Sequence, residues 1–517
     1  MPPSPSIRPQ GAEPPIRDRG DACPGALRLH SAADGHLARV RLPAGDLTAR
    51  QAEALADAAD RLGDGHLSLT SRGNAELRGL PDGCGGRLAA LLRDAGLLPS
   101  ERHERVRNIL ASPLAGLDRH TPSDVRLWAR ELDGLLCASE SATALSGRFL
   151  FVLDDGRGDV AALGGDVSLV AERGGGGAPV GGGELPGAGV LSGAGRLPGS
   201  GGTALLRVGD DPAALRIAGP DAPRAALTAA EAFLTAAAAS GSGAWRVREL
   251  PDGHGLTARA VAERLRTAGI GCAEVAGAGT AYAGGAADVT GTADVAGTAD
   301  ATGAPAPASA PYAESLPYAD SVPPPASVPY ADSSAPGVIE GTDGARALSV
   351  LAPLGRLSVA QWRLLTAAAE DGAGALRLTP WRGVVIPGLS ADTAASRLRE
   401  LSAAGLITDP DSPWHRIGAC TGRPGCAKSR TDVRADASAA VTAGTPVPGE
   451  PGQQPAVRRL PVYWSGCERR CGHPHGAWVD VLATAEGYRV SVVQPQSTPA
   501  PHPAPAAPSA APCPTTS

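Results

Sequence analysis

Two closely spaced pairs of cysteines near the C-terminal end offer the most specific chemistry in the chain. Cys420 and Cys426 have the spacing C-x5-C, and Cys467 and Cys471 have the spacing C-x3-C. Four thiolates from two separate loops can enclose one iron–sulfur cluster. Small residues beside both pairs, such as Gly425, let the backbone bend tightly around a bulky inorganic group. The pattern therefore predicts an iron–sulfur site made of these four cysteines.

The alternatives for these thiols are a zinc ion, disulfides or unlinked thiols. Structural zinc sites favour C-x2–4-C spacings, which the first pair does not match. Disulfides need an oxidising compartment, and residues 1–21 contain no apolar signal-peptide core. The remaining cysteines have no ligand spacing, and we expect each to be a small buried or incidental residue: Cys23, Cys84, Cys137, Cys272 and Cys513.

Composition limits the class of protein. A chain of 517 residues is long enough for several domains, and its net charge of −6 argues against nucleic acid as a partner. No apolar run approaches the length of a membrane span, so we expect a soluble, cytoplasmic protein without a membrane partner. Lys428 is the only lysine among 47 basic Lys and Arg residues. Any mechanism that requires two lysine ammonium groups is therefore excluded.

Several segments are too rich in Gly, Pro, Ala and Thr to bury a core. We expect disordered tails at 1–24 and 495–517, a Gly-rich loop at 173–202 and a low-complexity linker at 273–344. A further loose insertion is expected at 435–457, between the two cysteine pairs.

The rest of the chain contains an internal duplication, with copies at 38–80 and 348–389. Each copy predicts a short strand, an amphipathic helix, a second strand and a second helix. Thr48 and Ser358 stand where they can cap the first helix of each copy. Arg72 and Arg382 follow the second strand. Two such units imply an α+β fold with pseudo-twofold symmetry.

Arginines recur at the ends of strands and in loops of four separate segments. Singly, each is compatible with an ordinary surface arginine. Together they suit a ligand with several carboxylates, because guanidinium groups bind carboxylates through paired hydrogen bonds. With the two asparagines beside them, the candidate ligand-binding residues are Arg72, Asn74, Arg107, Asn108, Arg148 and Arg382.

Four blocks together resemble the nitrite/sulfite reductase superfamily. "TSRGNAEL" is similar to that family's T-T-R-x-x-x-Q block, "RVRNILASP" to R-N-V-x-x-x-P, and "LSGRFLFVLDDG" to L-P-R-K-F-K, while the cysteine array is similar to its cluster site. The resemblance implies two ferredoxin-like half domains at 25–103 and 345–410, an α+β domain at 104–272 and a [4Fe–4S]-binding domain at 411–494.

Within this superfamily, "LTSRGN", "RLTPWRGVVIPGL" and "SGCERRCGHP" most resemble the precorrin-3B synthase family. The resemblance implies a [4Fe–4S] cluster on Cys420, Cys426, Cys467 and Cys471, with a mononuclear iron or sirohaem as a further cofactor. It implies O2-dependent hydroxylation of precorrin-3A, a polycarboxylate tetrapyrrole, with lactone formation. The alternatives are a sirohaem-dependent sulfite or nitrite reductase, or a non-catalytic cluster protein.

Departures from the superfamily pattern help to choose among its members. The block with Arg148 has no lysine, whereas sulfite and nitrite reductases use lysines beside the substrate anion. A guanidinium is a poor proton donor, which favours the hydroxylase. Arg469 and Arg470 stand in the C-x3-C loop where relatives have glycine or asparagine, and we expect them to raise the positive charge near the cluster. His473 could ligate iron, donate a hydrogen bond to the cluster or be an ordinary loop residue.

The source of electrons must lie outside the chain. There is no G-x-G-x-x-G motif, so we expect no dinucleotide bound in Rossmann fashion. Hydroxylation by O2 needs two electrons, and we therefore expect a separate donor such as a ferredoxin or an NAD(P)H-dependent reductase.

Overall fold

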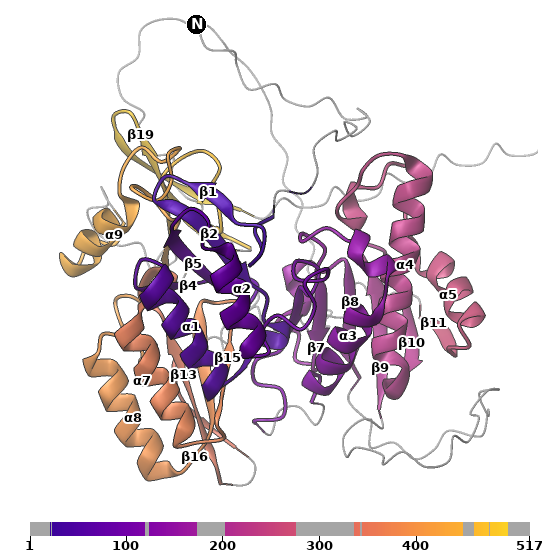
Figure 1. The fold of residues 1–517 in the computed structure, drawn as a ribbon, viewed down its shortest axis with the longest axis horizontal. Helices are drawn as coiled ribbons and strands as arrows, with labels where there is room; N and C mark the ends of the chain where they lie inside the picture. The colour runs from indigo at the N-terminus through magenta and orange to yellow at the C-terminus, as the bar shows by residue number, and fades with distance from the viewer. Residues whose placement is uncertain are drawn as a thin grey trace, which may run out of the picture.

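The described residues of the computed structural model form four β-sheets with helices packed against them (Figure 1). Two sheets belong to the duplicated halves, a third lies to one side with helices α3, α4 and α5, and a fourth carries the cysteines. The residues that the structure describes are 21, 23–118, 124–172, 202–275, 335–341, 344–447, 460–474 and 476–494.

The first half domain begins with β1 (His30–Ala32) and β2 (Gly35–Val40) and continues with β4 (His66–Leu69) and β5 (Ala75–Leu80). Helices α1 (Ala49–Leu62) and α2 (Gly85–Asp94) pack on this sheet. Thr48 accepts a hydrogen bond from the amide of Gln51, and the Gln51 side chain accepts from Thr48 in return. The predicted cap is confirmed, as a full capping box.

The second half domain repeats this order with β12 (Gly337–Glu340), β13 (Arg346–Leu351), β15 (Ala375–Leu378) and β16 (Gly383–Leu389). Its helices are α7 (Val359–Glu370) and α8 (Ala391–Ala403). Ser358 and Gln361 form the same capping box at the start of α7. The predicted strand–helix–strand–helix repeat is therefore confirmed.

Each half completes the sheet of the other half. Strand β3 (Asp46–Thr48) follows β2 in the chain but pairs with β15, whereas β14 (Arg356–Ser358) pairs with β4. Helices α1 and α7 lie side by side, where the indole of Trp362 donates to the carbonyl of Ala52 at 2.8 Å (Figure 1). One apolar core runs through both halves.

The turn after the strand that follows the first helix is equivalent in the two halves, which corrects one detail of the sequence alignment. In the first half, the amide of Gly73 donates to the carbonyl of Thr70; in the second half, the amide of Arg382 donates to Thr379. Gly73 has φ +65° and Arg382 has φ +59°. Arg382 therefore corresponds to Gly73, and the residue that corresponds to Arg72 is Trp381.

The third sheet has the order β11-β10-β9-β8-β7-β6, with β6 (Ile109–Ala111), β7 (Phe151–Asp154) and β8 (Val167–Ala171) parallel. Strands β9 (Thr203–Val208), β10 (Ala214–Ala218) and β11 (Cys272–Val275) extend it. Helices α3 (Arg126–Ala138), α4 (Ala222–Ser240) and α5 (Ala258–Thr267) enclose a second core with this sheet. Strand β7 is buried throughout.

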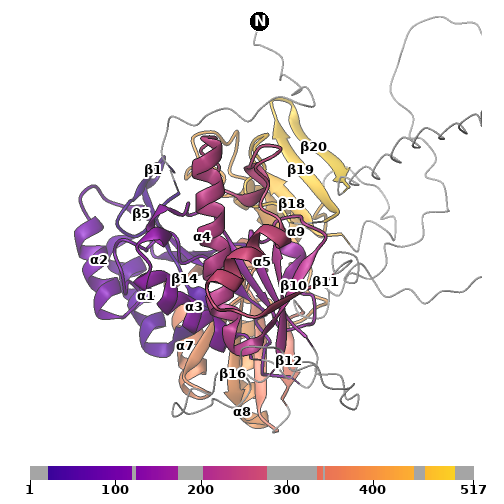
Figure 2. The ribbon, with the colours of Figure 1, turned by 90° about the vertical axis from the view of Figure 1, so that its right-hand side faces the viewer.

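The fourth sheet has the order β17-β18-β19-β20. Its strands are β17 (Ile417–Ala419), β18 (Val462–Ser465), β19 (Trp478–Thr484) and β20 (Gly487–Val493). Helix α9 (Val433–Thr442) packs beside β18 (Figure 2). This helix corrects the expectation of a loose insertion over 435–457, since part of that range is helical.

The linker expected at 273–344 also proves too long, because most of β11 and all of β12 fall inside it. The expected tails and the Gly-rich run at 173–202 lie almost wholly outside the described residues, as does Cys513. The domain boundaries given above therefore remain predictions. In the part of the chain that the structure describes, no helix is long and apolar enough to cross a membrane.

Candidate functional site

Parallel pairing of β17 with β18 brings the two cysteine loops together. Ala419 lies opposite Trp464, so the loops that follow both strands leave the same edge of the sheet. The amide of Cys420 donates to the Trp464 carbonyl at 3.0 Å, and the amide of Gly466 donates to the Cys420 sulfur at 3.2 Å. A Cβ atom on Gly466 would lie 1.9 Å from the Ser429 hydroxyl, so only glycine fits there.

The spacing of the four sulfurs suits a cluster better than a single zinc ion. Four thiolates on one zinc, with Zn–S bonds of about 2.3 Å, would stand roughly 3.8 Å apart. Among the described residues, no three cysteine sulfurs lie within 4.8 Å of one another. Cys471 nevertheless lies near the other three cysteines. Burial and the nearby thiols of Cys467, Cys420 and Cys426 raise its pKa. The four cysteines therefore fit an iron–sulfur cluster, whose size and charge would occupy the space between them.

The C-x3-C loop is held by a buried ion pair. Arg470 adopts φ +46° and donates through Nε to the carboxylate of Asp480 on β19, with an N–O distance of 2.5 Å. Asp480 is fully buried, and its second oxygen, Oδ1, has no hydrogen-bond partner. Arg470 is thus neutralised rather than a free charge beside the cysteines, and its left-handed backbone explains why glycine or asparagine suits this position.

Arg382 ties the second half domain to the same loop. Its Nη2 donates to the carbonyl of Gly472 at 2.6 Å, and its guanidinium lies over the ring of Tyr463, 5.4 Å from the centroid. The Tyr463 hydroxyl donates to the carbonyl of Cys471 at 2.6 Å. Arg382 therefore positions the cysteine loop, and its Nη2 group is engaged in the hydrogen bond to Gly472.

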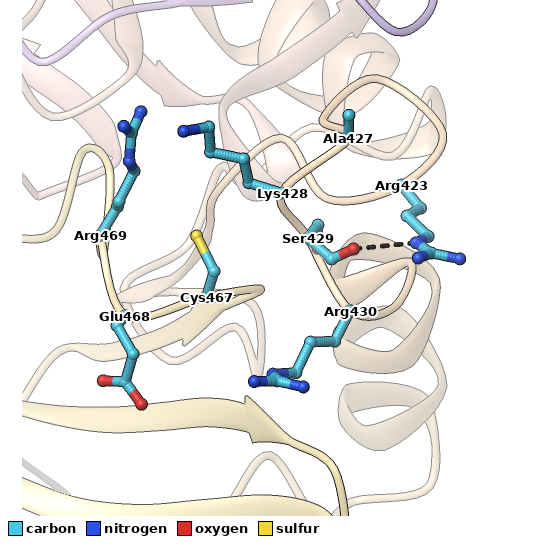
Figure 3. A pocket seen from close by; sticks show the side chains of 8 residues that line it. All are labelled: Arg423, Ala427, Lys428, Ser429, Arg430, Cys467, Glu468 and Arg469. Carbon is cyan, nitrogen blue, oxygen red and sulfur yellow. Dashed lines mark hydrogen bonds between the residues drawn. The ribbon is translucent and has the colours of Figure 1, made fainter. Parts of the chain in front are cut away.

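A basic pocket opens beside Cys467, with a volume of about 420 Å³. Figure 3 shows the Cys467 sulfur pointing toward the space between Lys428 and Arg469. The charged side chains that line the pocket are Arg423, Lys428, Arg430, Glu468 and Arg469. Four cations against one carboxylate make this surface attractive to an anionic partner. Arg469 accordingly keeps the positive charge that was expected near the cysteines.

Five arginines gather between the first half domain and the third sheet, and we refer to them as the arginine group: Arg39, Arg41, Arg72, Arg148 and Arg246. Burial, followed by the charges of Arg246 and Arg39, lowers the pKa of Arg72 to about 10. Burial and the charges of Arg39 and Arg72 lower the pKa of Arg41 to about 9. Such crowding of like charges favours a bound anion.

Only some members of the arginine group are paired with a carboxylate. Arg39 pairs with Glu76 at 2.9 Å, and Arg246 pairs with Asp166 at 2.5 Å. The Arg72 guanidinium donates to the carbonyl of Arg148 at 3.3 Å.

Arg148 itself is exposed, and its guanidinium lies over the indole of Trp245, 5.3 Å from the ring centroid. Arg72 and Arg148 thus lack a carboxylate partner among the described residues.

Three of the candidate residues do not belong to the arginine group. Arg107 is buried and forms a bidentate ion pair with Asp133, with both N–O distances 2.7 Å. Asn74 accepts from the amide of Leu42 and donates to Asn108. Asn108 in turn donates to the Phe149 carbonyl, and both asparagines are buried. In this structure the polar groups of the three residues bind other parts of the protein, and their role in ligand binding stays a prediction.

An ion-pair chain links the arginine group to the cysteine loop. Glu76, which pairs with Arg39, also contacts Arg78 at 3.3 Å. Arg78 donates to Asp34 and, at 2.7 Å, to the carbonyl of Gly425 beside Cys426. The two sites therefore share a continuous polar connection.

His473 is held by two contacts of its ring. Its Nδ1 lies 2.8 Å from the Pro474 carbonyl, and its ring stacks on Trp478 with centroids 5.2 Å apart. Of the three roles open to it, these contacts favour an ordinary loop residue.

Sequence reasoning missed Arg39, Arg41, Trp245 and Arg246. The first two stand at alternate positions at the end of β2, a pattern that places both side chains on one face. Trp245 and Arg246 follow α4 in an irregular segment that carries no local signal.

Comparisons with known proteins agree with this architecture. The model of the family "Nitrite/Sulfite reductase ferredoxin-like half domain" matches residues 30–93 and 339–404, one match in each half. The solved structure of the Mycobacterium tuberculosis NirA protein superposes with a TM-score of 0.56 over 88% of this chain and 74% of that chain, at 16% identity. The predicted α+β architecture with duplicated halves is therefore confirmed.

Curated relatives match over shorter stretches. A precorrin-3B synthase from Sinorhizobium sp. is 36% identical over 154 residues, which is 30% of this chain and 33% of that protein. A ferredoxin–nitrite reductase from Leptolyngbya laminosa is 34% identical over 105 residues, 19% of this chain and 20% of that enzyme. The matched stretches thus span a third or less of these relatives.

Proposed function

We propose that the chain is a member of the nitrite/sulfite reductase superfamily and that it hydroxylates precorrin-3A to precorrin-3B with O2. One oxygen atom enters a C–H bond at a meso carbon of the tetrapyrrole, and an acetate side chain closes to a lactone. The second oxygen atom leaves as water, which consumes two electrons and two protons. The similarity to a precorrin-3B synthase supports this choice among the members of the superfamily.

The arginine group is the observation that carries the proposal. Precorrin-3A is a polycarboxylate, and each guanidinium can bind a carboxylate through two parallel hydrogen bonds. Arg72 and Arg148 have no carboxylate of their own among the described residues. Trp245 adds an aromatic surface beside Arg148. Arg72 and Arg148 are therefore assigned to the acidic side chains of the substrate.

The scarcity of lysine supports oxygen insertion over oxyanion reduction. Reduction of sulfite or nitrite needs repeated protonation of the bound anion, for which arginine is poorly suited because a guanidinium holds its proton tightly at neutral pH. The single lysine, Lys428, lines the pocket beside Cys467. The alternative function, a sirohaem-dependent reductase, keeps support from the similarity to nitrite reductases.

Cys420, Cys426, Cys467 and Cys471 would hold a [4Fe–4S] cluster, which supplies a store for single electrons. The chain's own residues shape its surroundings. Gly466 donates a hydrogen bond to the Cys420 sulfur, and Arg382 and Tyr463 fix the carbonyls next to Cys471. Metal analysis and acid–acetone extraction would detect a mononuclear iron or sirohaem bound beside the cluster.

The basic pocket beside Cys467 is the proposed contact for the electron donor. An acidic redox protein such as a ferredoxin, or an acidic face of an NAD(P)H-dependent reductase, would meet Lys428 and Arg469 close to the cysteines. Complementary charge speeds such encounters and makes them sensitive to salt.

The decisive experiment is incubation of the reduced protein with precorrin-3A under isotopically labelled O2 or under argon, followed by mass spectrometry. We expect one labelled oxygen atom in the product under O2 and none under argon. Absence of labelled product under O2 would exclude the hydroxylase. Stoichiometric sirohaem on acid–acetone extraction, together with sulfite or nitrite reduction, would establish the alternative. If the protein shows neither activity, the remaining alternative is a non-catalytic cluster protein.

A further inference from the structure

A second cavity, of about 290 Å³, lies between the two half domains and helix α9, and it shares no lining residue with the basic pocket. It opens where β14 pairs with β4, at the start of helix α7. Its polar lining consists of His66, Arg356, Ser358, Gln361, Arg434 and Ser438, and Trp414 forms an apolar wall. None of these residues belongs to the arginine group or to the four cysteines.

Arg434 contributes a guanidinium that is only partly satisfied. Its Nε donates to the carbonyl of Cys420 at 3.2 Å. Neither of its two Nη groups has a hydrogen-bond partner among the described residues. Arg434 lines the cavity, so these two groups are available to donate to a bound anion.

Arg356 places a second guanidinium in the same cavity. Its Nη2 pairs with Asp64 at 2.7 Å, but its Nε is buried without a hydrogen-bond partner. Two cations therefore share the cavity with the carboxylate of Asp64 nearby and the more remote charge of Glu76. His66, which lies beside Asp64, adds no negative charge. The cavity has an excess of donor groups over acceptors.

The first turn of helix α7 strengthens this preference. The start of a helix carries partial positive charge from its unpaired amides. Ser358 and Gln361, which cap α7, both line the cavity. The helix thus adds its dipole to the two guanidinium charges.

We propose that this cavity binds a small oxyanion, with a phosphate or carboxylate group held between Arg356 and Arg434. Ligand pockets in proteins usually measure roughly 300–1,000 Å³, so this one takes a compact anion rather than a tetrapyrrole ring. The same Arg434 holds the backbone of Cys420, so an anion here would also stiffen the first cysteine loop. The proposal does not depend on the hydroxylation reaction.

Calorimetric titration of the cofactor-loaded protein with inorganic phosphate tests the proposal. The variants Arg434→Gln and Arg356→Gln should each weaken phosphate binding by about tenfold or more, because each removes one charged donor. The matched control is Arg399→Gln, an exposed arginine on α8, which should bind phosphate like the wild type. No binding to the wild type, or unchanged binding in Arg434→Gln, would overturn the proposal.

Arg434→Gln could disturb the cysteine loop, so iron content and circular dichroism are measured on every variant. Arg356→Gln keeps the Arg434–Cys420 bond and isolates the loss of charge. Uroporphyrin, a polycarboxylate tetrapyrrole, serves as the second probe. Phosphate binding that uroporphyrin leaves unchanged supports a separate oxyanion site. Competitive displacement of phosphate by uroporphyrin would instead make the cavity part of the tetrapyrrole site and overturn the proposal.

Discussion

Arg382 occupies the backbone position in the second half domain that Gly73 occupies in the first. Both residues have left-handed φ angles, +59° and +65°, and both close the same hydrogen-bonded turn. A side chain at such an angle costs roughly 1–2 kcal/mol, which glycine avoids. The second half keeps an arginine there, and its guanidinium bonds the carbonyl of Gly472. Backbone strain at this turn therefore accompanies a contact to the cysteine loop.

Arg382→Gly should separate these two effects. Removing the strain offsets much of the lost hydrogen bond, so we expect the free energy of unfolding to change by less than about 1 kcal/mol. The loop around Cys471 should nevertheless loosen, which accelerates loss of iron to a chelator. Thermal denaturation and the rate of iron release measure the two quantities.

Ala44→Gly is the control for Arg382→Gly, since Ala44 has φ +58° and no side-chain hydrogen bond. It should leave the rate of iron release unchanged. Equal rates of iron release in Arg382→Gly and the wild type would contradict the assigned role of Arg382.

Arg470 and Asp480 allow a double-mutant test of the C-x3-C loop. Arg470→Gly suits the positive φ angle but leaves a fully buried carboxylate without its partner. We expect a loss of about 2–3 kcal/mol, at or below the usual range for a broken buried pair because Arg470 is partly exposed. The double variant Arg470→Gly, Asp480→Val should recover most of this loss. Urea denaturation of the wild type, Arg470→Gly, Asp480→Val and the double variant gives the coupling energy. Strict additivity of the two single losses would refute the pairing.

Asp159 should make stability depend on pH. It is fully buried near Asp154 and Asp155, and its Oδ2 has no hydrogen-bond partner. Burial and the charge of Asp154 raise its pKa to about 7. The native protein therefore retains a proton that the unfolded chain releases from about pH 4 upward, so this group reduces stability as pH rises toward 7.

Asp159→Asn should accordingly raise the free energy of unfolding at pH 8 by up to a few kcal/mol and leave it nearly unchanged at pH 4. Ser112 can still donate to the amide oxygen as it does to Oδ1. Chemical denaturation between pH 4 and pH 8 supplies the comparison. A constant difference between variant and wild type across this range would show that Asp159 does not titrate there.

Substitution of arginines should distinguish ligand binding from support of the fold. Arg72→Leu should weaken uroporphyrin binding roughly tenfold, because one charged hydrogen-bonding group is lost, with little effect on stability. Arg107→Leu should lower stability and leave uroporphyrin affinity nearly unchanged, since it removes the ion-pair partner of the half-buried Asp133. Fluorescence titration and thermal denaturation report the two effects. Unchanged uroporphyrin affinity in Arg72→Leu would exclude Arg72 from the binding site.

The cysteine assignment has a direct test. Each of Cys420→Ser, Cys426→Ser, Cys467→Ser and Cys471→Ser should reduce iron and acid-labile sulfide, because a cluster needs all four thiolates. Cys272→Ser, a half-buried cysteine on β11, is the matched control and should retain both. Zinc without sulfide in the purified protein would contradict the cluster.

Local signals in the sequence predicted local structure well. Thr48 and Gln51 are three residues apart, as are Ser358 and Gln361, so each capping box could be read directly. Partners that are distant in the chain could not. Arg107 resembles a ligand-binding residue until α3 brings Asp133 to it, and nothing in the local sequence indicates that contact.

The exchanged strands were equally hidden. Strands β3 and β14 are three residues long, too short for alternation to identify them. Their destination depends on the pairing of the two halves, which only the assembled core decides. For the same reason, the sequence identified only part of the arginine group. Arg41 and Arg246 come from segments far apart in the chain, and only the fold brings them together.

The exchange of β3 and β14 also constrains how the protein can be made. On a ribosome, the first half domain must wait for residues 356–358 before its sheet is complete, so its edge at β4 stays open while the intervening chain is synthesised. An open strand edge invites pairing with the wrong chain. The two copies consequently mature together or not at all, and a gene divided between them would encode two fragments that each lack an edge.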